Sequence, residues 1–383
     1  MTTDSNQQPE PPQERRSLLD RLPILQPDVP TETPEAEVPP PPTVVPEVVE
    51  RVIEEPVAVS PPRPQERPSG VTAPPLPQAA PSPPPSRKRS FFGEPVTTLS
   101  IDGASLSVVS SNRGMVESWY TAEFDSTRFF REGYIYDPRG LGTFIGDLLR
   151  EKGFSPKHIV CALPGIGCEF NTVTIPTMKK VSVEKMMNLE LKKVMTTPVE
   201  ETHVTWHVFP DRMGKRRAFV VAVPNGIIES WVEACHAAGG TLHGMDMRIL
   251  ALARAINRKD GIIVHRGGNW VEIAIVVNFV PALVRCLSLG DQYMEPEMAT
   301  THVLNQASFT INFYAGGSAG GDPLPDDAPV YLTGDLATDP EVADSIAGYI
   351  DHPVGAIQPP LVYPPNLPLE QYLVNIGLVL KKT

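Results

Sequence analysis

The sequence predicts an α/β protein made of two related halves with a cleft between them. One stretch is rich in Val and Ile and reads as three consecutive strands, Ile262–His265, Val271–Asn278 and Ala282–Ser288. The break at Gly267–Gly268 would let the backbone come close to a ligand or to another backbone. An earlier stretch repeats this order of strand, small-residue turn, strand, turn and strand.

The earlier stretch covers residues 96–124. An apolar run to Ile101 meets Asp102–Gly103–Ala104, a second run covers Leu106–Ser110, and Val116–Thr121 returns after a turn. Any antiparallel meander would show this pattern, so two unrelated meanders are the alternative. Because both meanders begin with a small-residue turn and both are followed by helices, we favour a duplicated domain.

Residues 1–92 are predicted to be a disordered, Pro-rich tail. They hold 24 of the 44 prolines and almost no aromatic side chains, so they cannot form a core. Within the tail, Arg15–Leu25 places leucines at helical spacing. This segment could be a short motif that folds on a partner, or an inert apolar patch.

Charge and cysteine content argue against several classes of function. The formal net charge is −12, of which the tail carries −4, so the remainder is acidic and nucleic acid is not expected as a partner. The four cysteines form no CxxC pair, which favours reduced thiols in the cytoplasm and no metal site. The sequence has no run of about 20 apolar residues and no signal-peptide pattern, so we expect neither a membrane span nor export.

Further elements follow each meander. Helices are predicted at Thr127–Gly133 and Leu141–Lys152, followed by a buried strand at His158–Pro164. A strand-helix-strand-strand module at about residues 168–220 looks inserted. Its elements are Phe170–Pro176, Ser182–Met195, Thr202–Phe209 and Arg217–Val223.

The remaining predicted elements complete two halves. They are helices at Asn225–Gly239, Arg248–Arg258, Ala299–Phe313, Glu341–Ile350 and Leu369–Leu380, and a strand at Pro329–Thr333. The predicted first half spans 93–257, includes the module 168–220 and is completed by the C-terminal helix within 369–383. The predicted second half spans 258–368.

Short motifs in a fixed order give the chain from about Pro95 onward a resemblance to a known family. They are ALPG at Ala162–Gly165, TIP at Thr174–Pro176, VAVP at Val221–Pro224, ILALARAI at Ile249–Ile256, SLGD at Ser288–Asp291, FY at Phe313–Tyr314, LTG at Leu332–Gly334 and NIGLVL at Asn375–Leu380. In order and spacing they resemble the PilM family of type IV pilus assembly proteins, actin-like ATPase-fold relatives of the cell-division protein FtsA. This resemblance implies a ribonuclease H-like duplicated, two-lobed fold with a nucleotide between the halves. It also implies that the cytoplasmic N-terminal tail of a membrane partner, PilN, binds beside the inserted module.

The turns that would hold a nucleotide depart from the family pattern. The first family loop, LDIGSSSVK, falls on Leu99–Ser107, so its acidic position is Ser100, and Asp102 lies two residues further on. The second loop, VDIG, is Val264–Gly267, where His265 replaces the aspartate. The candidate nucleotide-binding residues are Asp102, Gly103, Ser105, Gly267, Gly268, Gly334 and Asp335. Because Mg²⁺ needs carboxylates, we expect at most weak ATP binding, doubtful Mg²⁺ capture and little or no hydrolysis, and we assign no catalytic residue.

The resemblance therefore implies a cytoplasmic scaffold of a type IV pilus or a related secretion machine, held at the inner membrane through a PilN-like bitopic protein. The pilus motor or other assembly proteins would be further partners. The half-exposed edge strand Glu169–Thr174 is the expected docking region. One alternative is an active ATPase or kinase that uses Asp102. Another is an FtsA-like cell-division adaptor, which a terminal membrane helix would favour, although Gln371–Thr383 reads as a docked helix.

Overall fold

The computed structural model describes residues 95–176, 183–208, 215–290, 296–317, 322–338, 342 and 345–381. All of them belong to one compact unit. The predicted tail 1–92 and its motif Arg15–Leu25 lie outside the described residues.

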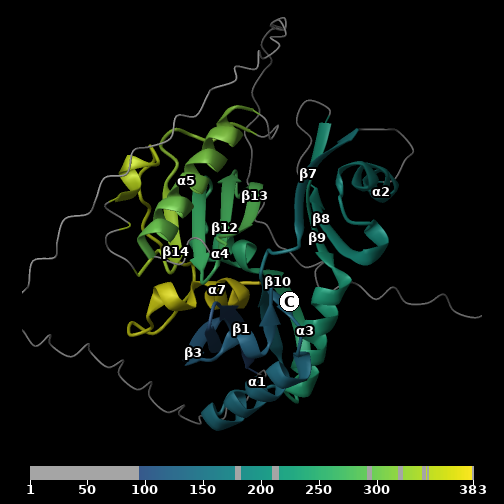
Figure 1. Ribbon diagram of the computed structural model, residues 1–383, viewed down its shortest axis with the longest axis vertical. Helices are drawn as coiled ribbons and strands as arrows, with labels where there is room; N and C mark the ends of the chain where they lie inside the picture. Colours follow the sequence, from purple (N-terminus) through teal and green to yellow (C-terminus); the bar gives the residue numbers. More distant parts are fainter. Residues whose placement is uncertain are drawn as a thin grey trace, which may run out of the picture. The chain divides into compact units, whose positions relative to one another are not determined.

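The first sheet has the strand order β10-β6-β1-β2-β3 (Figure 1). An antiparallel meander is formed by β1 (Val96–Asp102), β2 (Ser105–Asn112) and β3 (Met115–Glu123). Two strands then extend the sheet in parallel on the β1 side, β6 (Ile159–Leu163) and β10 (Leu242–Met247).

The second sheet repeats this topology with the order β13-β12-β11-β14. Its antiparallel meander is formed by β11 (Gly261–Gly267), β12 (Trp270–Val277) and β13 (Val280–Ser288). The last strand, β14 (Val330–Gly334), lies parallel to β11. Each sheet is thus a meander extended by parallel strands beside its first strand, which confirms the predicted duplicated α/β fold.

A smaller sheet carries the predicted strand-helix-strand-strand elements. Its antiparallel order is β7-β9-β8, with β7 at Glu169–Pro176, β8 at Thr202–Val208 and β9 at Lys215–Pro224. One helix, α2 (Val183–Val194), packs against it through buried Met187 and other apolar side chains. Strand β7 lies at an edge of this sheet, as predicted for the strand Glu169–Thr174.

Local sequence signals set the ends of α1 (Pro138–Lys152). The Asp137 carboxylate accepts a hydrogen bond from the Gly140 amide at 2.9 Å, and the helix ends at Gly153 in the left-handed conformation. These caps extend the predicted helix Leu141–Lys152 at its start. The other helices of the described residues include α3 (Asn225–Ala237), α4 (Arg248–Ile256), α5 (Pro296–Ala315) and α7 (Leu369–Val379), with 3₁₀ turns η1 (Ser126–Arg128), η2 (Val199–Glu201) and η4 (Ile346–Gly348).

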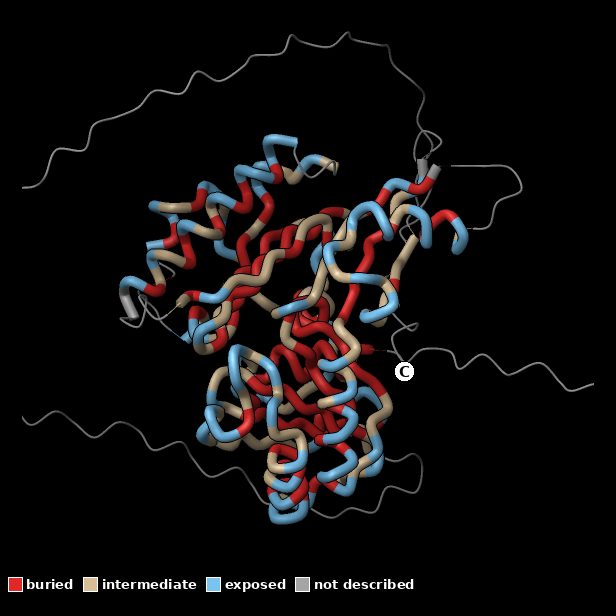
Figure 2. The backbone as a smooth tube through the Cα atoms, turned by 45° about the vertical axis from the view of Figure 1, so that its right-hand side comes forward, coloured by how far each residue is buried: buried red, intermediate tan, exposed pale blue. Residues whose placement is uncertain are grey.

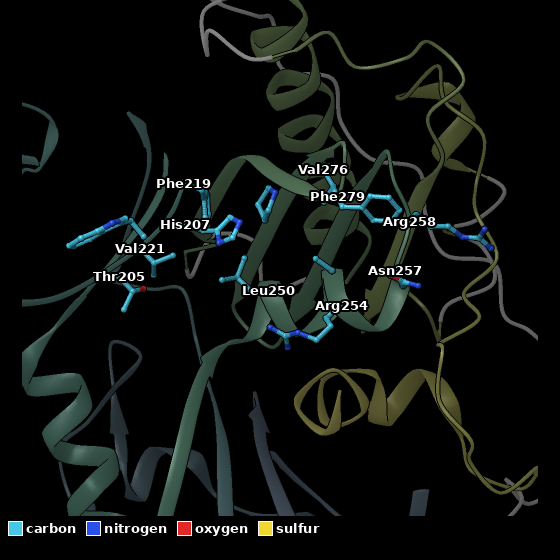
Figure 3. Close-up of a pocket in the computed structure, with 13 residues that line it drawn as sticks. Thr205, His207, Phe219, Val221, Leu250, Arg254, Asn257, Arg258, Val276 and Phe279 are labelled. Atoms are coloured by element: carbon cyan, nitrogen blue, oxygen red, sulfur yellow. The ribbon is translucent and has the colours of Figure 1, made fainter. Parts of the chain in front are cut away.

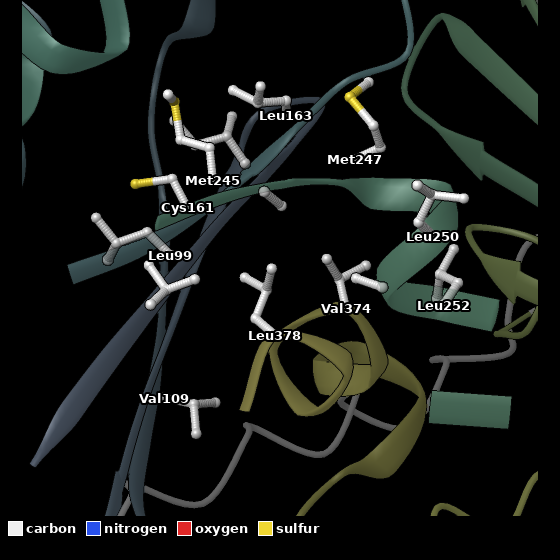
Figure 4. Close-up of a cluster of buried hydrophobic side chains, with 14 of the residues drawn as sticks. Leu99, Val109, Cys161, Leu163, Met245, Met247, Leu250, Leu252, Val374 and Leu378 are labelled. Carbon is white, nitrogen blue, oxygen red and sulfur yellow. The ribbon is translucent and has the colours of Figure 1, made fainter. Parts of the chain in front are cut away.

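The largest apolar core lies where the first sheet meets α4 and α7 (Figure 4). Figure 2 shows buried residues in red, and many of them lie along the strands of the sheets. Met245 and Met247 of β10 are both buried here. The core therefore joins segments from both ends of the described chain.

Helix α7 is fixed to the first sheet by polar contacts as well as apolar ones. The buried Asn375 amide donates hydrogen bonds to the carbonyl oxygens of Thr98 at 3.0 Å and Ser107 at 3.2 Å. On its other side, α7 packs closely on α4, since a Cβ at Gly377 would lie 1.9 Å from the carbonyl oxygen of Ala251. The position of α4, which carries residues of the candidate site, depends on this close approach.

Three sequence expectations need correction or addition. Thr127–Gly133 is not an α-helix, because a 3₁₀ turn is followed there by the short hairpin of β4 (Phe130–Arg131) and β5 (Tyr134–Ile135). The hairpin turn places Glu132 and Gly133 in the left-handed region, which an α-helix cannot accommodate. Strand β10 was missed, and the described part of the predicted helix Glu341–Ile350 has helical residues at 342 and 345 followed by the 3₁₀ turn η4.

We predict that Gly377→Ala destabilises the protein by about 1–3 kcal/mol, although Ala favours helices, because the new methyl would collide with α4. The matched control is Gly226→Ala in α3, where nothing lies within 4 Å of the added Cβ. The control should leave stability unchanged or raise it slightly. Urea unfolding of both variants measures the difference, and equal stabilities would show that α7 can move away from α4 at little cost.

Candidate functional site

The β1–β2 turn of the first sheet and the β11–β12 turn of the second sheet touch each other. A Cβ at Gly103 would lie 3.3 Å from the Cα and the amide nitrogen of Gly268, and a Cβ at Gly268 would lie 2.9 Å from the Cα of Gly103. Both glycines have φ of +57°. These positions require glycine both for their backbone conformation and for the close approach of the turns.

Asp102, at the end of β1, points from the first sheet into the second. Its Oδ2 lies 3.1 Å from His265 Nε2, and its Oδ1 lies 3.6 Å from Arg248 Nη1. The approach is possible because residue 267 is glycine, where a Cβ would lie only 1.4 Å from Asp102 Oδ1. Burial by itself would raise the pKa of Asp102, but His265 and Arg248 outweigh it and lower the pKa to about 2. The side chain is therefore a stable carboxylate.

Arg248 and Glu272 complete a buried charge cluster that the sequence reasoning missed. Arg248 begins α4, is 5% exposed, and donates a hydrogen bond to the Ile101 carbonyl at 2.7 Å. Glu272, in β12, is 2% exposed and lies 3.7 Å from Arg248, while it accepts a hydrogen bond from the Gly165 amide at 2.8 Å. The available signal was a single carboxylate within the apolar strand Trp270–Val277, because a buried charge needs a partner.

The end of β14 adds the last predicted residues to this cluster. Gly334 has φ of +67°, and a Cβ there would lie 2.1 Å from the carbonyl oxygen of Arg266. Next to it, the Asp335 carboxylate accepts a hydrogen bond from the Gly268 amide at 3.0 Å. The pKa of Asp335 is raised, first by burial and second by the negative charge of Asp102. His265 is held on its other side by the Thr333 hydroxyl at 3.0 Å.

The structure brings together most of the predicted nucleotide-binding residues. Those that meet at the two turns are Asp102, Gly103, Gly267, Gly268, Gly334 and Asp335. Ser105 does not join them, because its hydroxyl donates a hydrogen bond to the Glu123 carboxylate on β3. His265, which replaces the family aspartate, bridges Asp102 and Thr333 through its ring.

These residues do not fit a metal-bound polyphosphate. Such a ligand needs free carboxylate oxygens, free turn amides and open space between the turns. Here the Asp102 carboxylate faces Arg248 and His265, the Gly268 amide is used by Asp335, and the turns are in contact. Within the described part of the chain, no group of three or more His, Cys, Asp or Glu side chains is placed to hold a metal ion.

A separate apolar pocket opens between the small sheet and α4 (Figure 3). Its empty volume is about 750 Å³, including the part open to solvent. Aromatic side chains from β8, β9 and the β12–β13 turn line it, namely Trp206, Phe219 and Phe279. Arg254 of α4 and Arg258, two residues beyond the end of this helix, also line it, and none of its lining residues is acidic.

Phe279 is held at this pocket in a strained conformation. Its φ is +62°, in the left-handed region that a bulky side chain rarely adopts, and Asn278 before it has φ of +54°. The turn is fixed by hydrogen bonds from the Phe279 amide to the Lys259 carbonyl at 2.7 Å and from the Asn278 amide to Asp260 Oδ1 at 2.9 Å. Positive φ at both central residues is what a two-residue hairpin turn requires, so this turn fixes the Phe279 ring at the wall of the pocket.

Comparison with known proteins identifies the fold. The chain is similar to a solved PilM–PilN type IV pilus biogenesis complex, with a TM-score of 0.61, 16% identity, and coverage of 74% of this chain and 97% of that one. Also similar are the cytoplasmic domain of EpsL, an inner membrane component of the type II secretion system of Vibrio cholerae (TM-score 0.44, 13% identity, 76% and 97% covered), and the ethanolamine utilization protein EutJ from Carboxydothermus hydrogenoformans (TM-score 0.44, 14% identity, 76% and 91% covered). No protein-family model matches the chain, and no curated protein matches it. The chain has the predicted actin-like, two-lobed fold.

Among the helices of the described ranges, none has the length and apolar character needed to cross a bilayer. The four cysteines are free thiols, and the Sγ atoms of buried Cys161 and Cys235 lie 3.6 Å apart. Burial raises the pKa of Cys161 well above its ordinary value. This thiol is therefore protonated and unreactive at neutral pH.

The lowered pKa of Asp102 predicts a specific pH dependence of stability. A carboxyl whose pKa falls from 3.8 to about 2 on folding stabilises the protein above about pH 4, by about 2 kcal/mol, and loses this contribution as the pH falls toward 2. Asp102→Asn removes the titrating group. The difference in unfolding free energy between wild type and variant should shrink between pH 4 and pH 2, and a constant difference would contradict the assignment.

Proposed function

We propose that this protein is a scaffold of a pilus or secretion assembly machine at the cytoplasmic face of the inner membrane. It binds the cytoplasmic N-terminal tail of a PilN-like bitopic protein and does not hydrolyse ATP. The fold shared with PilM and the family motifs in their order support this proposal. The observation that carries it is the combination of an apolar peptide-sized pocket beside the small sheet with a pair of nucleotide turns that are closed on each other.

The chemistry of the pocket suits an extended peptide. Trp206 of β8 and Phe279 of the β12–β13 turn both line the pocket, so an apolar side chain of a peptide would be shielded from water there by aromatic rings. Arg258 adds a positive charge at the pocket, whereas the Arg254 guanidinium is already engaged by Asp246 and the Gly377 carbonyl. Strand β8 is an edge of its sheet and runs along the pocket. The expected docking strand β7 is the opposite edge, so the pocket moves the proposed binding region to the β8 side.

The two alternative functions gain less support. An ATPase or kinase that uses Asp102 would need its carboxylate oxygens free, and both are directed at Arg248 and His265. An FtsA-like adaptor would need a terminal helix free to bind a membrane. The last helix, α7, buries Tyr372–Leu378 against the first sheet and α4.

A binding measurement tests the proposal directly. The full-length chain is titrated with a peptide that corresponds to the cytoplasmic N-terminal tail of a PilN-like single-span membrane protein, and we expect micromolar affinity that does not change when Mg-ATP is added. Trp206 provides a fluorescence signal because it lines the pocket. Absence of binding, or binding only in the presence of Mg-ATP, would contradict the proposed function.

Phe279→Asn separates a binding role from a structural one. Asn tolerates the left-handed conformation, so the free energy of unfolding of the variant should exceed that of wild type by about 1 kcal/mol. Loss of the aromatic wall should nevertheless weaken binding of the partner tail by roughly tenfold. Both effects are read from urea unfolding and from titration.

The matched control is Glu132→Asn in the β4–β5 turn, where φ is +52° and the side chain does not line the pocket. It should raise stability by a similar amount and leave the affinity for the partner tail unchanged. If Phe279→Asn also leaves the affinity unchanged, the partner does not bind in this pocket.

A further inference from the structure

The groups that could bind an anion between the two sheets already have anionic partners within the chain. Turn amides, a guanidinium and an imidazole are the protein groups that hold phosphate oxygens. At the junction of the turns these groups are the Gly268 amide, the Arg248 guanidinium and the His265 ring. The Gly268 amide donates a hydrogen bond to Asp335, while His265 Nε2 and Arg248 Nη1 lie 3.1 Å and 3.6 Å from the carboxylate oxygens of Asp102.

The two carboxylates come from opposite sides of the junction. Asp102 follows β1 of the first sheet and reaches His265 of β11 at 3.1 Å. Asp335 follows β14 and accepts the hydrogen bond of the Gly268 amide at 3.0 Å, while its Oδ2 lies 3.8 Å from Arg266 Nε. Asp102 thus links the two sheets, and the Asp335 carboxylate binds the Gly268 amide of the β11–β12 turn.

Glycine at three positions lets the carboxylates reach these places. A Cβ at Gly267 would overlap Asp102 Oδ1, and a Cβ at Gly103 or Gly268 would push the two turns apart. A polyphosphate between the turns would have to displace Asp102 and break its contacts with Arg248 and His265. Those contacts are buried, and removing one partner of a buried ion pair is strongly unfavourable.

We propose that Asp102 and Asp335 are built-in anions, which occupy the latent phosphate site at the junction of the two sheets and hold the sheets together without a nucleotide. The site is complete within the chain, and Arg248 is the cation that both sheets share, through Asp102 and through Glu272. Pyrophosphate is the chemical class of ligand that the site would accept once the carboxylates are removed. The proposal does not depend on partner docking, because the pocket of Trp206 and Phe279 is not part of this junction.

The test uses thermal unfolding of the full-length chain with pyrophosphate or ATP at about 5 mM, with and without Mg²⁺. The wild type should show no shift of Tm with any of these ligands. The double variant Asp102→Ala, Asp335→Ala should have a Tm lower by roughly 5 °C or more, because Arg248 and His265 lose an anionic partner. Pyrophosphate should restore roughly 2 °C or more of this loss.

The matched control is Asp147→Ala with Glu151→Ala on the exposed surface of α1, which changes the net charge equally. It should show neither the fall in Tm nor the response to pyrophosphate, so a general attraction of anions to a less acidic chain is excluded. If the double variant does not fold, the single variant Asp335→Ala is tested in the same way. The Asp335 carboxylate is about half exposed, and its removal frees the Gly268 amide to bind pyrophosphate.

Two results would overturn the proposal. One is a wild type whose Tm rises with Mg-ATP, since the site would then accept a nucleotide without loss of its carboxylates. The other is a folded double variant that keeps the wild-type Tm or ignores pyrophosphate. A failure to bind the partner tail would leave this proposal unaffected and would count only against the scaffold function.

Discussion

The buried guanidinium of Arg248 is the interaction on which the junction of the two sheets depends. A charge at 5% exposure is tolerated only when opposite charges and hydrogen-bond acceptors surround it. Its partners come from both halves, with Asp102 and the Ile101 carbonyl from β1 and Glu272 from β12. Because neither sheet alone can compensate this charge, the burial of Arg248 requires that the two sheets stay together.

The position of Arg248 depends in turn on how α4 is held. Arg254, further along this helix, pairs with buried Asp246 at 2.7 Å and donates a hydrogen bond to the Gly377 carbonyl of α7 at 2.8 Å. Lys381 donates a hydrogen bond to the Met245 carbonyl at 2.7 Å, and burial lowers its pKa. The C-terminal helix is therefore fixed to β10 and α4 by charged groups in an apolar core, and it holds in place the helix that carries the shared cation.

The junction of the two sheets and the apolar pocket are separate places in the fold. Two meanders of the same topology present equivalent turns to each other, and these turns are in contact. In this chain, carboxylates fill the junction, while open apolar surface is found beside the small β7-β9-β8 sheet. Both features are consistent with a scaffold that binds a peptide whether or not a nucleotide is present. A rigid junction would keep the walls of the pocket in place.

The sequence by itself determined the elements and the duplicated architecture, because these follow from local patterns. Alternating and continuous apolar runs predicted β1, β6 and β11–β13, apolar spacing predicted α1 from Leu141 onward, and six of the seven candidate residues meet at the turns. Errors occurred where the local pattern was short, as at Thr127–Gly133, or mixed, as at β10 with its LHGMDM sequence. Only the tertiary structure decided that Arg248 meets Glu272, that Asp102 fills the junction and that Phe279 stands at a pocket. The physical reason is that apolar periodicity is a property of neighbouring residues, whereas the partner of a buried charge depends on which distant elements pack against it.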